Sequence, residues 1–271
     1  MPSTMHADMH ARFLALHRAE SPLLIANVWD AASAALWQHA GAPALVTGSA
    51  ALAWACGHAD GGALPREALL QKVHDIVRVA AVPVSIDVED GYSDAPEIVA
   101  SLVREVAEAG AVGINLEDGS GDPDLLVAKI KAIRTALGDT PLFINARTDV
   151  YLRGMASGEA AVKMSVERLA RYAEAGADGA FVPGLASADE IATVASGTTL
   201  PLNVMTVPGL PSLAELQLAG VRRISAGPAL FQHAYAAGLQ ATRQFLAGDM
   251  ARGLDTAMPY GELNELFAAA G

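Results

Sequence analysis

Short apolar runs alternate with amphipathic stretches along most of the chain. A run of apolar residues bounded by turn residues predicts a strand, and apolar positions three or four apart predict a helix. The runs predicted as strands are residues 23–27, 44–47, 83–89, 112–117, 141–147, 179–182, 201–204 and 222–225. Eight strands with helical patterns between them predict a (β/α)8 barrel of the TIM type rather than an open sheet.

Glycines mark the joints of this pattern. A glycine that ends a helix directly before an apolar run occurs at Gly41, Gly110, Gly176 and Gly220. No linker or change in composition divides the chain, so residues 1–271 are predicted to form one barrel domain. Within it we expect a leading amphipathic helix in 1–20, the barrel in 23–247 and a helical tail in 248–271. Residues 48–62 are predicted as a long loop.

Composition and charge narrow the class of protein. Hydrophobic residues make up 52% of the chain, which supplies a large core, and the net charge of −12 disfavours nucleic acid as a partner. Cys56 is the single cysteine, so no intrachain disulfide is expected and a reducing compartment fits. The apolar run 42–57 is too short to span a bilayer. We therefore expect a cytoplasmic protein without a signal peptide or membrane contact.

The segment 84–92, Val-Ser-Ile-Asp-Val-Glu-Asp-Gly-Tyr, carries the first candidate chemistry. If it is a strand, Asp87 and Glu89 lie on one face roughly 7 Å apart. Two neighbouring carboxylates repel each other unless a cation or a shared proton lies between them. A divalent ion such as Mg²⁺ is therefore the leading interpretation of this pair.

Other polar residues end neighbouring strands, and in such barrels the active site lies at the carboxyl ends of the strands. Asn115 and Glu117 share one strand face, and Asn145 and Arg147 share a face of the next strand. Asp118 and Asp149, taken singly, are predicted to form ordinary ion pairs. Asp87, Glu89, Glu117 and Arg147, taken as a set, predict a site, because unpaired charges are costly to bury.

Three motifs on consecutive strands resemble the isocitrate lyase and phosphoenolpyruvate mutase superfamily. They are Asp-Val-Glu-Asp-Gly-Tyr at 87–92, Asn-Leu-Glu-Asp at 115–118 and Asn-Ala-Arg-Thr-Asp at 145–149. The likeness runs from about residue 23 to 247. It implies a magnesium-dependent barrel that acts on small α-keto or α-hydroxy carboxylates through an enolpyruvate-like anion. It also implies a homo-oligomer, a tetramer or dimer, in which C-terminal helices are exchanged between subunits.

The resemblance assigns roles by position. It implies that Asp87 binds Mg²⁺ or Mn²⁺ directly, that Asp60, Glu89 and Glu117 hold the ion through water, and that Arg147 binds the substrate. The substrate-binding residues that it implies are Thr47, Gly48, Ser49, Ala50, Asp87, Arg147 and Asn203. Arg147, Glu117 and Tyr92 are the candidate catalytic residues.

The connection after Glu117 departs from the family pattern. Lyases of this family carry a lid with a reactive cysteine there, and mutases carry a longer gating loop with lysine and asparagine. Here only Asp118 to Asp122 separate Glu117 from the predicted helix at Pro123, which is too short for a lid. Tyr92, His58 and the segment 152–158 remain as candidate proton donors.

Three functions fit these residues. The first is a C–C lyase or decarboxylase that acts on a small carboxylate. The second is a phosphonate enzyme, either a mutase or a hydrolase of a C–P bond. The third is a carboxylate-binding relative without turnover.

Overall fold

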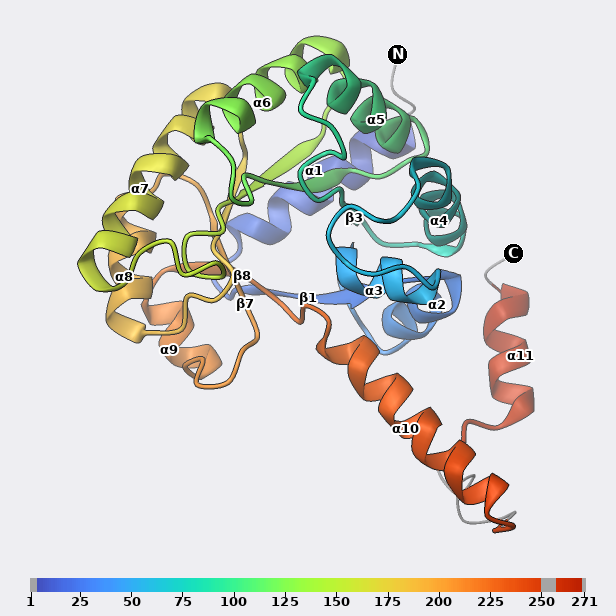
Figure 1. Ribbon diagram of the computed structural model, residues 1–271. Coiled ribbons are helices and arrows are strands. Elements are labelled where there is room, and N and C mark those ends of the chain that lie inside the picture. Colours follow the sequence, from blue (N-terminus) through green and yellow to red (C-terminus); the bar gives the residue numbers. More distant parts are fainter. Residues whose placement is uncertain (1–3, 250–256, 270–271) are drawn as a thin grey trace.

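Eight parallel strands close into a barrel in the computed structural model of the chain, which describes residues 4–249 and 257–269 (Figure 1). The strands pair in sequence order, and β8 pairs with β1. They are β1 Leu23–Val28, β2 Leu45–Thr47, β3 Val84–Asp87, β4 Gly113–Glu117, β5 Phe143–Arg147, β6 Gly179–Phe181, β7 Leu202–Met205 and β8 Val221–Ser225. The predicted (β/α)8 fold class is confirmed.

Helices surround the barrel because each strand returns to the next parallel strand through a crossover. Those that precede or follow the strands are α1 Thr4–Arg18, α2 Ala31–His39, α3 Ser49–Ala55, α4 Arg66–Val79, α5 Pro96–Glu108, α6 Pro123–Leu137, α7 Gly158–Ala175, α8 Ala188–Gly197, α9 Leu213–Leu218, α10 Ala229–Leu246 and α11 Tyr260–Ala269. The apolar faces of α2 to α9 pack with the strands in one large core cluster, and Phe13 of α1 belongs to a second, smaller cluster.

The leading helix α1 lies against the amino end of the barrel. Phe13 and His17 are buried, and both rings pack against Phe143 of β5. His6 is also buried, and its Nε2 lies 2.9 Å from the carbonyl oxygen of Pro141. These contacts seal the end of the barrel opposite the carboxyl ends of the strands.

Two predicted elements are wrong. Residues 49–55 form helix α3 rather than a loop, because their alanine-rich run favours a helix and Gly48 provides its N-cap position. Strand β3 ends at Asp87, not at Glu89. The Asp87 side chain accepts a hydrogen bond from the Glu89 amide at 3.1 Å, which turns the backbone out of the strand.

The C-terminal helices extend beyond the barrel. Helix α10 projects away from it, and α11 returns to lie beside α2 (Figure 1). Of the α10 side chains only Phe231 is buried. In the predicted tail 248–271, residues 250–256 and 270–271 lie outside the described part of the structure. No helix among the described residues is long and apolar enough to cross a membrane.

Candidate active site

A cavity of about 280 Å³ opens where the carboxyl ends of the strands meet. Its wall combines residues that follow β2, the acids at the ends of β3 and β4, and the arginine that ends β5. The predicted site residues that line it are Gly48, Ser49, Ala50, Asp60, Asp87, Glu89, Glu117 and Arg147. The structure therefore brings most of the predicted site residues together in one place.

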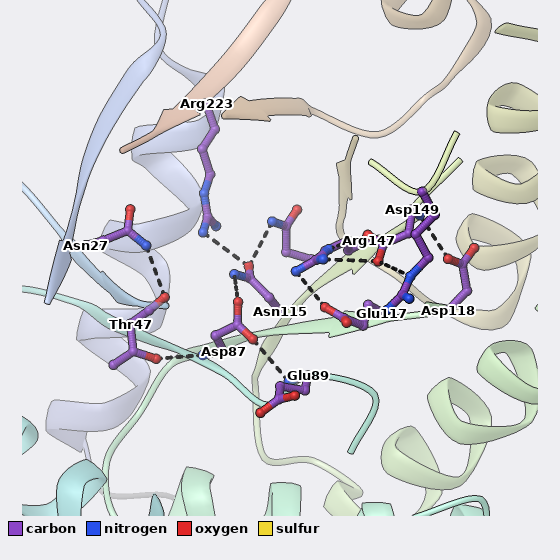
Figure 2. Close-up of polar contacts among 12 residues, drawn as sticks. Asn27, Thr47, Asp87, Glu89, Asn115, Glu117, Asp118, Arg147, Asp149 and Arg223 are labelled. Atoms are coloured by element: carbon purple, nitrogen blue, oxygen red, sulfur yellow. Dashed lines mark hydrogen bonds and ion pairs between the residues drawn. The ribbon is translucent and has the colours of Figure 1, made fainter. Parts of the chain in front are cut away.

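Asp87 is fixed at the base of this cavity. Its backbone amide donates to Thr47 Oγ1 at 2.8 Å, and its Oδ2 accepts from Asn115 Nδ2 at 3.2 Å (Figure 2). Its Oδ1 accepts from the Glu89 amide. The carboxylate is thus oriented by β2, β4 and the turn after β3.

Glu89 reaches the cavity from a strained turn. Its φ of 51° is positive, and Tyr92 has a φ of 58°, both unusual for residues other than glycine. The Glu117 amide donates to the carbonyl oxygen of Glu89 at 2.9 Å, which holds the turn against β4. Glu89 Oε1 and the Tyr92 hydroxyl are buried and make no hydrogen bond of good geometry, although the hydroxyl interacts with the Glu89 carboxylate. A buried carboxylate oxygen in this state can accept a further donor or contact a cation.

Arg147 forms the opposite wall. The register pairs Glu117 with Arg147 and Asn115 with Asn145, as the strand-face argument predicts. Arg147 Nη1 lies 2.6 Å from Glu117 Oε2, while Nε and Nη2 donate to the two oxygens of Asp149 at 2.6 and 3.1 Å (Figure 2). Glu117 and Asp149 thus lock the guanidinium in place, with its Cζ atom 5.8 Å from the Phe181 ring centroid.

Burial and mutual repulsion raise the pKa values of the acids in the cavity. Burial raises the pKa of Glu89 to about 7, and the charges of Asp87 and Asp60 add to the shift. Burial raises the pKa of Glu117 to about 8 against the attraction of Arg147. Burial also raises the pKa of Asp87. The cluster therefore has more negative charge than its own cations balance.

These acids fit a divalent cation held mainly through water. Among the described residues, no three His, Cys, Asp or Glu side chains converge closely enough to ligate one ion directly. Mg²⁺ usually keeps several waters and binds proteins through one or two carboxylates. The buried Oε1 of Glu89 and the raised pKa values of Asp87, Glu89 and Glu117 fit such an ion.

Three predicted site residues do not line the cavity. Thr47 is fully buried and supports Asp87 from behind. Asn203 is also fully buried, one layer below the cavity, where its Oδ1 accepts from Asn145 Nδ2 at 3.1 Å. Strand β7 continues to Met205, which lines the wall in its place. Tyr92 lies behind Glu89, and this places it beside the acid rather than at the cavity surface.

A polar layer lies inside the barrel beneath Asp87. Asn115 Oδ1 accepts from Asn145 Nδ2 at 3.0 Å and from Arg223 Nη2 at 3.3 Å (Figure 2). Arg223 is fully buried, and its Nε and Nη1 have no partner. Burial lowers the pKa of Arg223 against the attraction of Asp87. A guanidinium stays protonated in proteins, so the layer carries one buried positive charge.

The loop after β4 is as short as the sequence predicts, and side-chain contacts of Asp118 clamp it. β4 ends at Glu117 and α6 begins at Pro123. Asp118 Oδ1 accepts from the Asp149 amide at 2.9 Å, and its Oδ2 accepts from Arg168 at 2.8 Å and from the Tyr172 hydroxyl at 2.6 Å. The predicted ion-pair roles of Asp118 and Asp149 are confirmed by these contacts.

Sequence reasoning missed several residues of the cavity wall. They are Asn27, Ala51, Gly61, Phe181, Pro183, Met205, Ser225, Gly227 and Pro228, together with Asn115, which was placed at the mouth without a role. Leu152 and Arg153 of the wall belong to the segment 152–158, which was proposed as a source of the proton donor. Asn27 donates to the Thr47 carbonyl at 3.2 Å and accepts from the Gly227 amide at 2.9 Å, which ties β1 to the ends of β2 and β8. A polar residue near the end of an otherwise apolar strand was the available signal for Asn27.

Comparison with known proteins adds independent findings. Residues 13–246 match the family described as phosphoenolpyruvate phosphomutase. A crystal structure from Burkholderia cenocepacia J2315, provisionally described as a phosphonomutase, is 42% identical with a TM-score of 0.83, covering 88% of this chain and 100% of that one. An oxaloacetate decarboxylase of Pseudomonas savastanoi pv. phaseolicola is 30% identical, covering 89% of this chain and 85% of its own.

A third similar protein is a lyase whose crystal structure is known. The crystal structure of a 2,3-dimethylmalate lyase, described as a member of the PEP mutase/isocitrate lyase superfamily, is 26% identical with a TM-score of 0.84. The alignment covers 98% of this chain and 95% of the lyase. The similarity thus extends over the whole barrel and is not confined to the three strand-end motifs.

Proposed function

Because this chain belongs to the phosphoenolpyruvate mutase and isocitrate lyase superfamily, we propose that it is a magnesium-dependent lyase acting on a small α-keto or α-hydroxy carboxylate. It breaks a C–C bond through an enolpyruvate-like intermediate. The observation that carries the proposal is the convergence of Asp87, Glu89 and Glu117 with Arg147 on one cavity. Oxaloacetate decarboxylase relatives support C–C cleavage.

Each residue of the cavity has a distinct task in this proposal. Asp87 would hold Mg²⁺ or Mn²⁺, and Glu89, Glu117 and Asp60 would hold its waters. The cation supplies positive charge that polarises the keto oxygen and stabilises the negative charge developing there. Arg147 binds the substrate carboxylate by its guanidinium edge, and Glu117 and Asp149 keep that edge aimed at the cavity. Ser49 and the first amides of α3 bind the same carboxylate from the other side.

Decarboxylation of an oxaloacetate-type substrate illustrates how bonds, electrons and protons balance in the proposed reaction. The bond to the leaving carboxylate breaks, its electron pair moves into the enolate, and carbon dioxide departs. The enolate then takes one proton at carbon. Tyr92 lies behind Glu89, so it would act on this step only by positioning that acid.

A phosphonate-processing enzyme is the second candidate. The relative of 42% identity that is provisionally described as a phosphonomutase favours it. The same arginine and cation would hold a phosphonate as well as a carboxylate. A carboxylate-binding relative without turnover is the third, and the short loop 118–122 favours it.

We expect Asp87→Ala to lower magnesium-supported turnover at least about 100-fold, because a Lewis-acid cation contributes several kcal/mol to the barrier. Turnover of oxaloacetate, a 2-methylmalate-type acid and phosphonopyruvate should be followed by NMR, with an enzyme-free magnesium blank. Asp75→Ala, on the exposed side of α4, is the matched control.

The outcomes separate the candidates. Equal turnover by wild type and Asp87→Ala would remove the cation from the mechanism. Conversion of phosphonopyruvate alone would favour the second candidate. Tight magnesium-dependent oxalate binding without any conversion would favour the third.

A further inference from the structure

Two guanidinium groups line the cavity, and both are anchored on one carboxylate. Asp149 is fully buried and accepts from Arg147 through both of its oxygens. Its Oδ2 also accepts from Arg153 Nε at 3.1 Å. Asp149 therefore holds Arg147 through Nε and Nη2, but it holds Arg153 through Nε alone.

The two arginines differ in which of their nitrogen atoms already contact an acceptor. Arg147 uses Nε and Nη2 on Asp149 and Nη1 on Glu117. Arg153 makes the single contact through Nε, and in the described part of the chain its Nη1 and Nη2 have no hydrogen-bond acceptor. Its side chain is 47% exposed, so a ligand in the cavity can reach these donors.

The surroundings of Arg153 restrict where a second anionic group could lie. Gly61, Glu89, Glu117 and Arg153 also line an adjoining cavity of about 220 Å³. The rest of that cavity is strongly acidic, with Asp90, Asp94, Asp118 and Asp122 in its wall. Its one lysine, Lys129, donates to the carbonyl oxygen of Asp90 at 2.7 Å. Of the charged donor groups in the two cavities, only the Nη groups of Arg153 therefore make no contact with an acceptor in the described part of the chain.

We propose that Arg153 is a specificity-determining residue that binds the second carboxylate of a dicarboxylate substrate, while Arg147 binds the first. This inference rests on the proposed function and names its substrate class. The first carboxylate lies between Arg147 and Ser49, and the distal carboxylate lies against the Nη groups of Arg153. A substrate with one carboxylate leaves Arg153 without a ligand.

Malate and lactate test this assignment, because they share a 2-hydroxy carboxylate and differ only in the distal carboxylate. Their binding should be measured by calorimetry on the full-length protein with saturating Mg²⁺. We expect Arg153→Met to weaken malate binding about tenfold and lactate binding less than about twofold, as for the loss of one charge-assisted contact. Arg153→Lys should recover part of the loss. Arg104→Met, an exposed arginine on α5, is the matched control.

Salt gives an independent readout. Ionic strength screens an exposed charge pair, so added salt should weaken malate binding by wild type more than by Arg153→Met. A purely structural effect of Arg153→Met would lower the affinities for malate and lactate alike and would leave the salt dependence of malate binding unchanged. That result, or an unchanged preference for malate in Arg153→Met, would overturn the proposal.

Turnover separates this inference from the proposed function. If wild type converts oxaloacetate and Asp87→Ala does not, but Arg153→Met keeps the malate preference, only the role of Arg153 is wrong. If wild type binds neither acid and converts no substrate, both proposals fail together.

Discussion

At the scale of single residues, burial controls the protonation of the acids in the site. Glu89 and Glu117 have pKa values of about 7 and about 8, above the ordinary value of 4.5, because burial disfavours their charged forms. The folded chain therefore binds more protons than the unfolded chain between roughly pH 4.5 and 8. Stability falls as pH rises through that window, and a bound cation offsets the loss.

The melting temperature of the metal-free protein should therefore fall between about pH 5.5 and 8.5, and by less in Glu89→Gln than in wild type. Mg²⁺ should raise it more at the higher pH, because the carboxylates that it needs are ionised there. Differential scanning calorimetry measures both effects. Glu174→Gln, an exposed acid on α7, should behave as wild type. A magnesium effect that is equal at both pH values would contradict this account.

At the scale of elements, the turn after β3 is the piece that places Glu89. Gly91 closes this turn with a φ of +92°, and a Cβ at that position would lie 2.5 Å from Val99 Cγ1 of α5. The Gly91 amide donates to the Val88 carbonyl at 2.8 Å. The turn, rather than a strand, carries the second acid of the pair to the cavity.

Gly91→Ala should lower the free energy of unfolding by about 2–4 kcal/mol, because a left-handed backbone and a clash with Val99 combine. Gly41→Ala tests the backbone effect alone, since its φ is +96° and nothing lies within 4 Å of the added Cβ. We expect Gly41→Ala to lower the free energy of unfolding by about 1–2 kcal/mol. Urea unfolding measures both values, and equal losses would show that the contact with Val99 costs nothing.

The strand-end acids could be predicted from the sequence, because parallel strands bring their carboxyl ends to one edge. Glu117 and Arg147 met as expected, since their positions on adjacent strands match. Asn203 was predicted to contact the substrate, and β7 was taken to end at residue 204, whereas Met205 continues the strand and lines the wall. Helix α3 was missed because the glycines at 57, 61 and 62 were assigned to one loop that began at residue 48, although the alanine-rich run 49–55 favours a helix. Arg153 lies in the segment 152–158 that was proposed as a source of the proton donor, but its contact with Asp149 is defined only in three dimensions.

At the scale of the whole molecule, α10 and α11 leave apolar side chains uncovered. Tyr235, Leu239, Phe245 and Leu246 of α10 are exposed, and Tyr260 and Phe267 of α11 are exposed too. Apolar residues gathered on one projecting element mark an interaction surface. We propose that a second copy of the chain covers this surface, as helix exchange in the family implies.

Light scattering should then give a mass that is a multiple of 27.9 kDa, a dimer or a tetramer, at micromolar concentration. The double substitution Leu239→Asp and Leu246→Asp should shift the protein toward monomer, because it places charges in an apolar interface. Leu218→Asp on α9, a leucine that is 88% exposed, is the matched control and should leave the mass unchanged. A monomeric wild type would exclude the interface.

In the loop after β4, Asp118 is needed to hold the loop to the fold, whereas the tip of the loop can accept inserted residues. Asp118 ties the first residue of the loop to α7, whereas Ser120 and Gly121 are exposed. Residues inserted at such a tip add little closure entropy and leave the clamp intact. A change of reaction within this superfamily therefore has a simple evolutionary route here, in which the barrel and its acids stay fixed while one loop lengthens.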